Sequence, residues 1–137
     1  MDQEETTGRT PALAQLLGAW RESGDPPNWA SLKVRLGGLS ESVCLIRWTE
    51  GERAVIEEAG AQAVLAYGKP LAGASVDALT PGRSVAALEA TKALESGRPF
   101  TVEDVVGAGE QARRIARFYL PLDETPPAIA CGVVRID

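Results

Sequence analysis

The sequence predicts an α+β protein built on one sheet with helices packed against it. Three observations indicate this class. Helical spacing dominates the start of the chain, strand-like apolar runs precede and follow a central helical region, and glycine or proline separates successive elements. The chain has 137 residues, of which 45% are hydrophobic and 24% charged, so it is the size of one domain with its own core.

The N-terminal part is predicted to form two helices. Thr10 and Pro11 suit the start of the first, because threonine caps helices and proline fits the first helical position. A second helix is expected over 28–36. The apolar face of the first helix consists of Leu13, Leu16, Leu17 and Trp20. We divide the chain into a mobile acidic N-terminus (1–10), a helical lead-in (11–42) and a sheet domain (43–137).

Five apolar or alternating runs are predicted as strands, and they lie at 43–49, 54–56, 100–106, 111–122 and 128–136. Glu50-Gly51 supplies a hairpin turn between the first two. In the fourth strand the side chains alternate between two faces. One face carries Arg114, Ala116, Phe118, Leu120 and Leu122, and the other carries Arg113, Ile115, Arg117 and Tyr119.

Three helical segments are expected between the second and third strands, at 61–67, 76–79 and 82–96. Val64 and Leu65 are predicted on the buried face of the first. Leu88 belongs to the apolar stripe of the last, whereas Glu89 is expected to face water. The small side chains of residues 59–66 either leave room for a ligand or allow close packing of helix on sheet.

The segment that ends the first of these helices resembles the middle of a PAS domain. It reads Tyr67-Gly68-Lys69-Pro70-Leu71-Ala72-Gly73, and Ser75-Val76-Asp77-Ala78-Leu79 and Pro81 follow. The resemblance covers about residues 43–136 and is closest to stand-alone bacterial single-domain PAS proteins with an N-terminal helical lead-in. It implies a PAS-like five-stranded antiparallel sheet with short helices on one face. The N-terminal amphipathic helix would lie against the other face or against a partner subunit.

The predicted strands are apolar on both faces, so a second layer must cover the sheet. The N-terminal amphipathic helix is the candidate cover, either from the same chain or from a partner subunit. The resemblance adds that PAS domains often dimerise through this helix and the outer sheet face, so we expect a homodimer. The residues expected at the dimer or partner surface are Leu13, Leu16, Leu17, Trp20, Ile115, Arg117 and Tyr119.

The sequence contains no histidine, which removes the commonest general base, zinc ligand and proximal haem ligand. Cys44 and Cys131 are too far apart for a CxxC metal pair, and neither lies in a helix as the reactive cysteine of flavin-binding PAS domains does. We therefore expect no haem, flavin or metal. Both thiols are expected to be buried and reduced, since a disulfide would require neighbouring strands in matching register.

The net charge of −5 argues against nucleic-acid binding, which needs a basic face. No apolar run reaches the roughly 20 residues that span a bilayer. The acidic N-terminus lacks the basic-then-apolar layout of a signal peptide. We expect a cytoplasmic protein that binds neither nucleic acid nor membrane.

A ligand cavity is expected between the short helices and the sheet. An unknown small ligand is compatible with it, either apolar or carboxylic, and so is no ligand at all. The residues expected to line it are Ile56, Val64, Leu65, Tyr67, Leu71, Leu88 and Phe118. Arg113 and Arg117 share a strand face. They are expected at a solvated strand edge, in cross-strand pairs with Glu103 or Asp104, against an acidic partner surface or, if that face is inward, against an anionic ligand.

Two classes of function follow. The resemblance implies a non-enzymatic sensory or regulatory module of bacterial signal transduction, which acts on a histidine kinase of a two-component system or on another PAS-bearing regulator. The alternative is a small cone-shaped α+β enzyme of isomerase or dehydratase type. It would need Glu57, Glu58 or Asp104 as a buried acid and Tyr67 or Tyr119 as a hydrogen-bond donor. Neighbouring strand residues point to opposite faces, so Glu57 and Glu58 are not expected to share one site.

Overall fold

The computed structural model describes residues 11–49 and 53–136 of the chain. Its fold is α+β, with a five-stranded antiparallel sheet in the order β2-β1-β5-β4-β3, and this PAS-like architecture confirms the predicted fold class. The strands are β1 (Val43–Trp48), β2 (Ala54–Ala59), β3 (Phe100–Val106), β4 (Arg113–Pro121) and β5 (Ala128–Arg135). The α-helices are α2 (Pro11–Ser23), α3 (Trp29–Leu36), α4 (Ala61–Tyr67) and α5 (Ala86–Ser96). Segment 1–10 and the Glu50-Gly51 turn lie outside the described residues.

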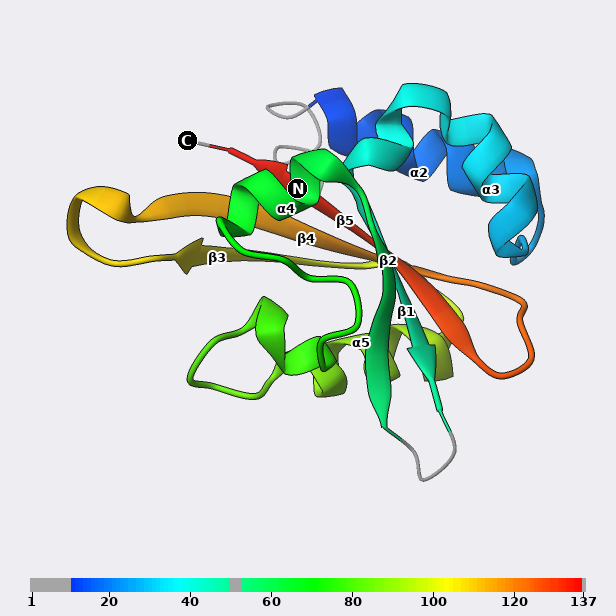
Figure 1. The fold of residues 1–137 in the computed structure, drawn as a ribbon. Helices are drawn as coiled ribbons and strands as arrows, with labels where there is room; N and C mark the ends of the chain where they lie inside the picture. The colour runs from blue at the N-terminus through cyan, green and yellow to red at the C-terminus, as the bar shows by residue number, and fades with distance from the viewer. Residues whose placement is uncertain (1–10, 50–52, 137) are drawn as a thin grey trace.

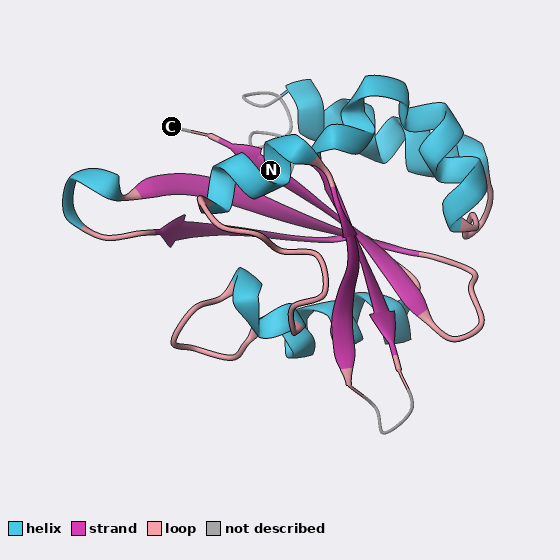
Figure 2. Ribbon diagram, viewed as in Figure 1, coloured by secondary structure: helices cyan, strands magenta, loops and turns pink. Residues whose placement is uncertain are grey.

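Helices cover both faces of the sheet (Figure 1). The helices α2 and α3 lie along one face, which we call the outer face, whereas α5 and the 3₁₀ turn η2 (Val76–Leu79) lie against the opposite, inner face. Coloured by secondary structure, the strands run between these two helical layers (Figure 2). The fold therefore has two separate cores, one on each side of the sheet.

The outer core is closed by the lead-in of the same chain. Leu13, Leu16 and Trp20 of α2 are at most 7% exposed, and the Trp20 Nε1 donates to the carbonyl of Pro121 at 2.7 Å. The cover that the apolar outer face requires is thus intramolecular. The other members of this core are Ala19, Leu32, Leu36, Val43, Leu45, Ala116, Phe118, Leu120, Leu122, Ala128 and Ala130.

The inner core uses small helical side chains where the sequence pattern favoured large ones. Leu65 and Leu88, which were predicted to face the core, are 65% and 71% exposed. Alanine allows a helix to approach a sheet closely, and close packing of both layers outweighs the burial of a few larger side chains. The alanines that face the inner core are Ala63 and Ala66 of α4 and Ala86, Ala90 and Ala93 of α5.

The start of α5 lies four residues later than the predicted start at Gly82. Ser84 adopts a φ of 54°, which interrupts any helix before it. The buried Thr80 hydroxyl accepts hydrogen bonds from the backbone N–H groups of Val85 and Ala86, at 3.2 and 3.1 Å. This side chain replaces a conventional cap at the start of α5, where the N-cap residue Val85 makes no side-chain hydrogen bond.

Candidate functional site

A buried arginine on β4 organises the polar part of the inner core. The strand alternates as predicted, so Ile115, Arg117 and Tyr119 face inward and Phe118 faces the outer core. The Arg117 side chain is 0% exposed, and charged side chains are rarely buried to this extent without partners. The contacts of Arg117 are therefore the ones that must stabilise a charge in the interior of the protein.

Glu89 of α5 binds the Arg117 guanidinium with both carboxylate oxygens. The Arg117 Nη2 lies 3.0 Å from Glu89 Oε1 and 3.1 Å from Oε2, and the Nε lies 3.1 Å from Oε1. The Tyr119 hydroxyl donates to the same Oε1 at 2.6 Å. The carboxylate is thus held by three donor groups, an arrangement that is among the stronger polar contacts in proteins.

Asp104 of β3 supplies a second carboxylate on the other side of Arg117. Its Oδ2 accepts from Arg117 Nη1 at 2.9 Å and also pairs with Arg83. Arg117 lies opposite Val102 in the β3–β4 register, so Asp104 is its diagonal neighbour and within reach of a long side chain. The Arg117–Asp104 pair is one of the cross-strand pairs that the sequence predicted.

The carbonyl of Leu79 in η2 completes the cluster. It accepts from Arg117 Nη1 at 3.4 Å and from the Tyr67 hydroxyl at 2.9 Å. This carbonyl connects α4 and η2 to the buried arginine. We refer to Arg117, Glu89, Asp104 and Tyr119 below as the arginine cluster.

The pKa shifts in the cluster favour fixed charges. Burial acts to lower the pKa of Arg117, but Tyr119, Tyr67, Asp104 and Glu89 together raise it above its ordinary value. Burial acts to raise the pKa of Asp104, but the hydrogen bonds from Arg117 and the Val105 N–H, with the charges of Arg117 and Arg83, hold it below its ordinary value. Burial raises the pKa of Tyr119 and of Tyr67, so both phenols stay protonated. The cluster binds and orients a carboxylate rather than accepting a proton.

The residues predicted to line a ligand cavity do not form one group. Ile56, Tyr67 and Leu71 are buried in the inner core, and Val64 packs against it. Phe118 lies in the outer core, on the opposite face of the sheet. Leu65 and Leu88 point to solvent, as described above, so three of these seven positions are corrected.

The residues predicted to form a dimer or partner surface are also divided between the two faces. Leu13, Leu16 and Trp20 are buried in the outer core of their own chain, with Leu17 partly buried beside them. Ile115, Arg117 and Tyr119 are each 0% exposed on the inner face. The predicted surface is therefore not a surface of this chain, because the α2 residues pack against the sheet and the three β4 residues are buried on its inner face.

Glu57 and Glu58 take part in one network of contacts on the lead-in side, which corrects the expectation that alternation separates them. The β1–β2 register shifts between Leu45 and Ile46, so that Glu57 is passed over and alternation is broken there. Glu57 pairs with Arg47 at 2.7 Å. Glu58 accepts from Lys33 and from the Trp29 Nε1, each at 3.0 Å. The Lys33 hydrogen bond is the main reason that the pKa of Glu58 is lowered.

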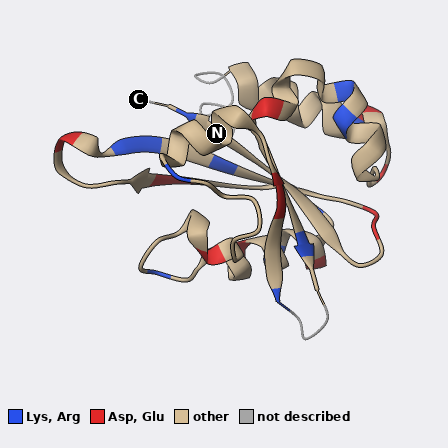
Figure 3. Cartoon of the chain, in the orientation of Figure 1, with Lys and Arg blue, Asp and Glu red and all other residues tan. Residues whose placement is uncertain are grey.

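The other predicted basic residues have local partners. Arg114, on the outer side of β4, pairs with Glu103 at 2.9 Å across the sheet. Arg113 donates to the carbonyl of Leu65 at 3.2 Å. Basic positions also lie on α3 (Figure 3), where the Arg35 Nη1 is 3.4 Å from the Glu22 carboxylate of α2.

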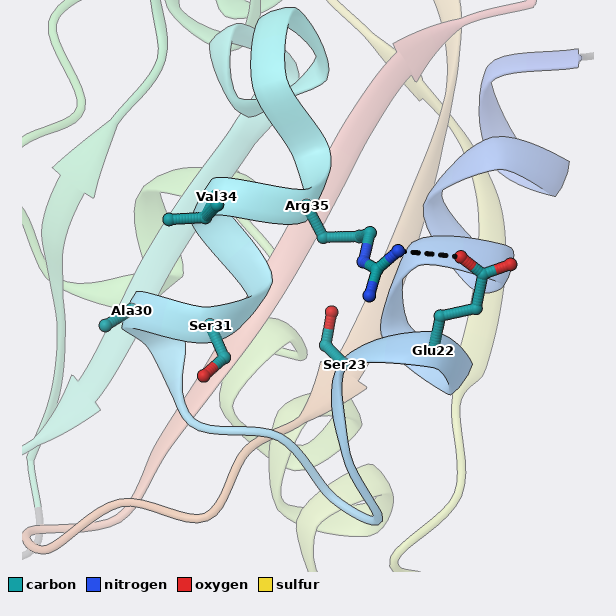
Figure 4. A pocket seen from close by; sticks show the side chains of 6 residues that line it. All are labelled: Glu22, Ser23, Ala30, Ser31, Val34 and Arg35. Carbon is teal, nitrogen blue, oxygen red and sulfur yellow. Dashed lines mark hydrogen bonds and ion pairs between the residues drawn. The ribbon is translucent and has the colours of Figure 1, made fainter.

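An open groove of about 740 Å³ lies between α2 and α3. The Arg35 side chain reaches from α3 to Glu22 of α2, and the side chain of Val34 points away from α2 (Figure 4). Val34 is 85% exposed. The groove is open, unlike ligand sites that enclose most of their ligand. The residues that line it are Glu22, Ser23, Ala30, Ser31, Val34 and Arg35.

The two cysteines are buried free thiols that lie directly opposite each other on β1 and β5. Their burial is as predicted, and their register meets the condition set for a disulfide. In the described residues, no three Cys, Asp or Glu side chains are grouped as a metal site would require. Nor does any helix in the described ranges have the length and apolar character of a membrane-spanning segment.

Sequence reasoning missed Glu89, because a charged residue in an amphipathic helix normally faces water. Two signals were available. Glu89 lies three residues after Ala86 and four before Ala93, on the side of α5 that meets the sheet. Arg117 also stands in an otherwise apolar strand, and a buried charge requires a partner.

Comparison with known proteins supports the fold only. No protein-family model and no curated protein sequence matches the chain. It is similar in structure to a domain of an HTR-like protein from Haloarcula marismortui ATCC 43049, with a TM-score of 0.50 and 17% sequence identity. The match covers 70% of this chain and 99% of that domain.

Proposed function

We propose that this chain is a non-enzymatic signalling module of the PAS superfamily, which acts by binding other proteins and is modulated by a small ligand. The observation that carries the proposal is the arginine cluster inside a PAS-like sheet. The charged groups of this cluster bind one another and hold α5 against the inner face, rather than presenting a reactive group. A module of this kind changes its helical surface when the contact between helix and sheet changes.

The contacts of the acids named for the enzymatic alternative, Asp104, Glu57 and Glu58, favour the signalling module instead. A general acid or base in an apolar site needs a raised pKa, as in the carboxylates of known proton-transfer enzymes. The pKa of Asp104 is lowered instead, and Arg117 and Arg83 neutralise it. Glu57 and Glu58 are exposed and bound by Arg47 and Lys33. We therefore keep the signalling module as the single proposal.

The proposed partner is a histidine kinase of a two-component system or another PAS-bearing regulator. Because the sheet is covered, such a partner would contact helices. Purified kinases and regulators from the source organism should be tested for saturable binding to this chain by calorimetry. Val34→Asp on α3 and Leu88→Asp on α5 change two exposed side chains on opposite layers, so each controls for the other. Loss of binding in one variant alone identifies the contacting layer.

A result that contradicts the proposal is equally concrete. Binding to none of these proteins, together with substrate turnover that disappears in Asp104→Asn, would establish the enzymatic reading. The homodimer stays a prediction that rests on the PAS resemblance alone, because one chain covers its own outer face. Native mass spectrometry of the purified chain measures subunit number and any retained small molecule together.

A further inference from the structure

We propose that Arg117 and Tyr119 form a binding site for a small monocarboxylate, and that Glu89 of α5 occupies this site in the free chain. A free carboxylate then competes with the helix for the same donors. This deepens the proposed function by naming the class of ligand and the element that it moves. The signalling consequence rests on that function, whereas carboxylate binding does not.

Glu89 is bound in the manner of a ligand. Its two oxygens accept from the Nε and Nη2 of one guanidinium, at distances between 3.0 and 3.1 Å, and the Tyr119 hydroxyl donates at 2.6 Å. Arginine donates through a rigid planar fork that fits any carboxylate, and the phenol adds a third donor. Nothing in these contacts depends on the rest of the glutamate, so a free carboxylate can make the same three.

Asp104 allows the exchange to occur without leaving a bare charge in the interior. Its Oδ2 stays 2.9 Å from Arg117 Nη1 and is also paired with Arg83. When a free carboxylate replaces that of Glu89, the numbers of positive and negative groups in the site do not change. An exchange that left Arg117 unpaired would be prohibitive. This one substitutes one anion for another.

The geometry of α5 makes it the element that moves. Its contacts with the inner core come from alanines, while Leu88 points to solvent at 71% exposure. The helix has 11 residues, and isolated helices of that length are marginal in water. Glu89 is 14% exposed whereas Arg117 is 0% exposed, so water reaches the carboxylate before the guanidinium. A ligand therefore approaches from the side on which Glu89 leaves.

The size of the site selects short acids. Beyond its Cβ, the glutamate side chain is equivalent to an acetate group, so Glu89→Ala removes an acetate from above Arg117. Acetate fits the space that remains, and propionate matches the whole side chain. Branched or aromatic acids exceed that space, because the alanine face of α5 packs directly on the sheet beside it.

The test uses thermal unfolding of the whole chain at pH 7 with increasing sodium acetate, against sodium chloride at the same ionic strength. In Glu89→Ala we expect a saturable rise in Tm with acetate that chloride does not give. Glu95→Ala, an exposed glutamate on the same helix, is the matched control. In that control Glu89 still occupies the site. If it does so in about 90% of the molecules, about ten times more acetate would be needed to give the same rise in Tm. Arg117→Met in the Glu89→Ala background should abolish the response.

Equal effects of acetate and chloride on Glu89→Ala would overturn the proposal. If that variant does not fold, the wild-type chain decides by NMR. We expect added propionate to shift the Arg117 Nε–H signal and the backbone amides of α5, and an unchanged spectrum would overturn the proposal. Neither readout involves a partner protein, so failure here leaves the proposed signalling function standing, and failure to bind a kinase leaves this site standing.

Discussion

Leu16 of α2 packs directly on Gly132 of β5. A Cβ built on Gly132 would stand 2.6 Å from the Leu16 Cδ1, which is closer than real side chains approach. The absence of a side chain at Gly132 therefore allows the lead-in helix α2 to pack closely on the outer face. This contact explains how α2 lies close enough to the sheet for Leu13, Leu16 and Trp20 to be buried together.

We expect Gly132→Ala to destabilise the fold by about 1–3 kcal/mol, because the added methyl overpacks the contact with Leu16. Gly18→Ala is the matched control, since a Cβ at Gly18 meets nothing within 4 Å. In the middle of α2, that substitution should stabilise by about 0.5–1 kcal/mol. Urea unfolding measures both. Destabilisation of similar size in the two variants would contradict the assigned role of Gly132.

We expect Arg117→Met to destabilise the chain by about 3–5 kcal/mol, because it leaves Glu89 and Asp104 without their buried cation. Arg114→Met removes the same side chain from the other face of the same strand. The Arg114 side chain is 55% exposed, so the loss of its pair with Glu103 should cost at most about 1 kcal/mol. Chemical denaturation of the two variants gives the comparison. Equal losses would show that burial of Arg117 carries no special cost.

The pH dependence of stability should contain a contribution from Asp104. Its folded pKa lies below the unfolded value of 3.8, so the stability it contributes is present above that value. That contribution is lost as pH falls, from about pH 5 through the unfolded and then the folded pKa. Asp104→Asn should flatten the acid limb of a plot of unfolding free energy against pH. Asp123→Asn, which removes an exposed carboxylate from the β4–β5 loop, controls for the loss of one charge, and identical curves for the two variants would refute this assignment.

Cys44 and Cys131 should resist thiol reagents while the chain is folded. Both are 0% exposed, and burial raises the pKa of Cys44 to about 12 and raises that of Cys131. The thiolate is the reactive form, so labelling at pH 8 requires unfolding. The labelling rate should rise with urea in parallel with the unfolded fraction, and two thiols should react in full denaturant. Rapid labelling without denaturant would show that the inner core is open to solvent.

Strand patterns predicted more of this fold than helix patterns did. The alternation of β4 placed Arg117 and Tyr119 on one face and Phe118 on the other, because a period of two leaves no third choice. In α4 and α5 the pattern favoured Leu65 and Leu88, the most hydrophobic residues at hand. The buried face is lined by alanines instead, since the distance between helix and sheet, which no local pattern encodes, decides which side chains fit.

The candidate site was predictable in part for a related reason. Arg117 was identified as inward-facing only conditionally, and its pairing with Asp104 across β3 and β4 was one of the predicted outcomes. Glu89 comes from a helix 28 positions earlier in the sequence. Its role depends on where α5 lies on the sheet, which the helical pattern of α5 alone does not encode.

The burial of α2 against its own sheet changes how a mutational screen of this chain should be interpreted. The apolar side chains of α2, which the amphipathic pattern indicates as a binding surface, contribute to the stability of the fold instead. A scan that substitutes Leu13, Leu16 or Trp20 and measures partner binding would record the unfolding of the chain as the loss of a binding contact. Only the outward side chains of the helical layers, such as Val34, separate the two effects, because they can be changed while the protein stays intact.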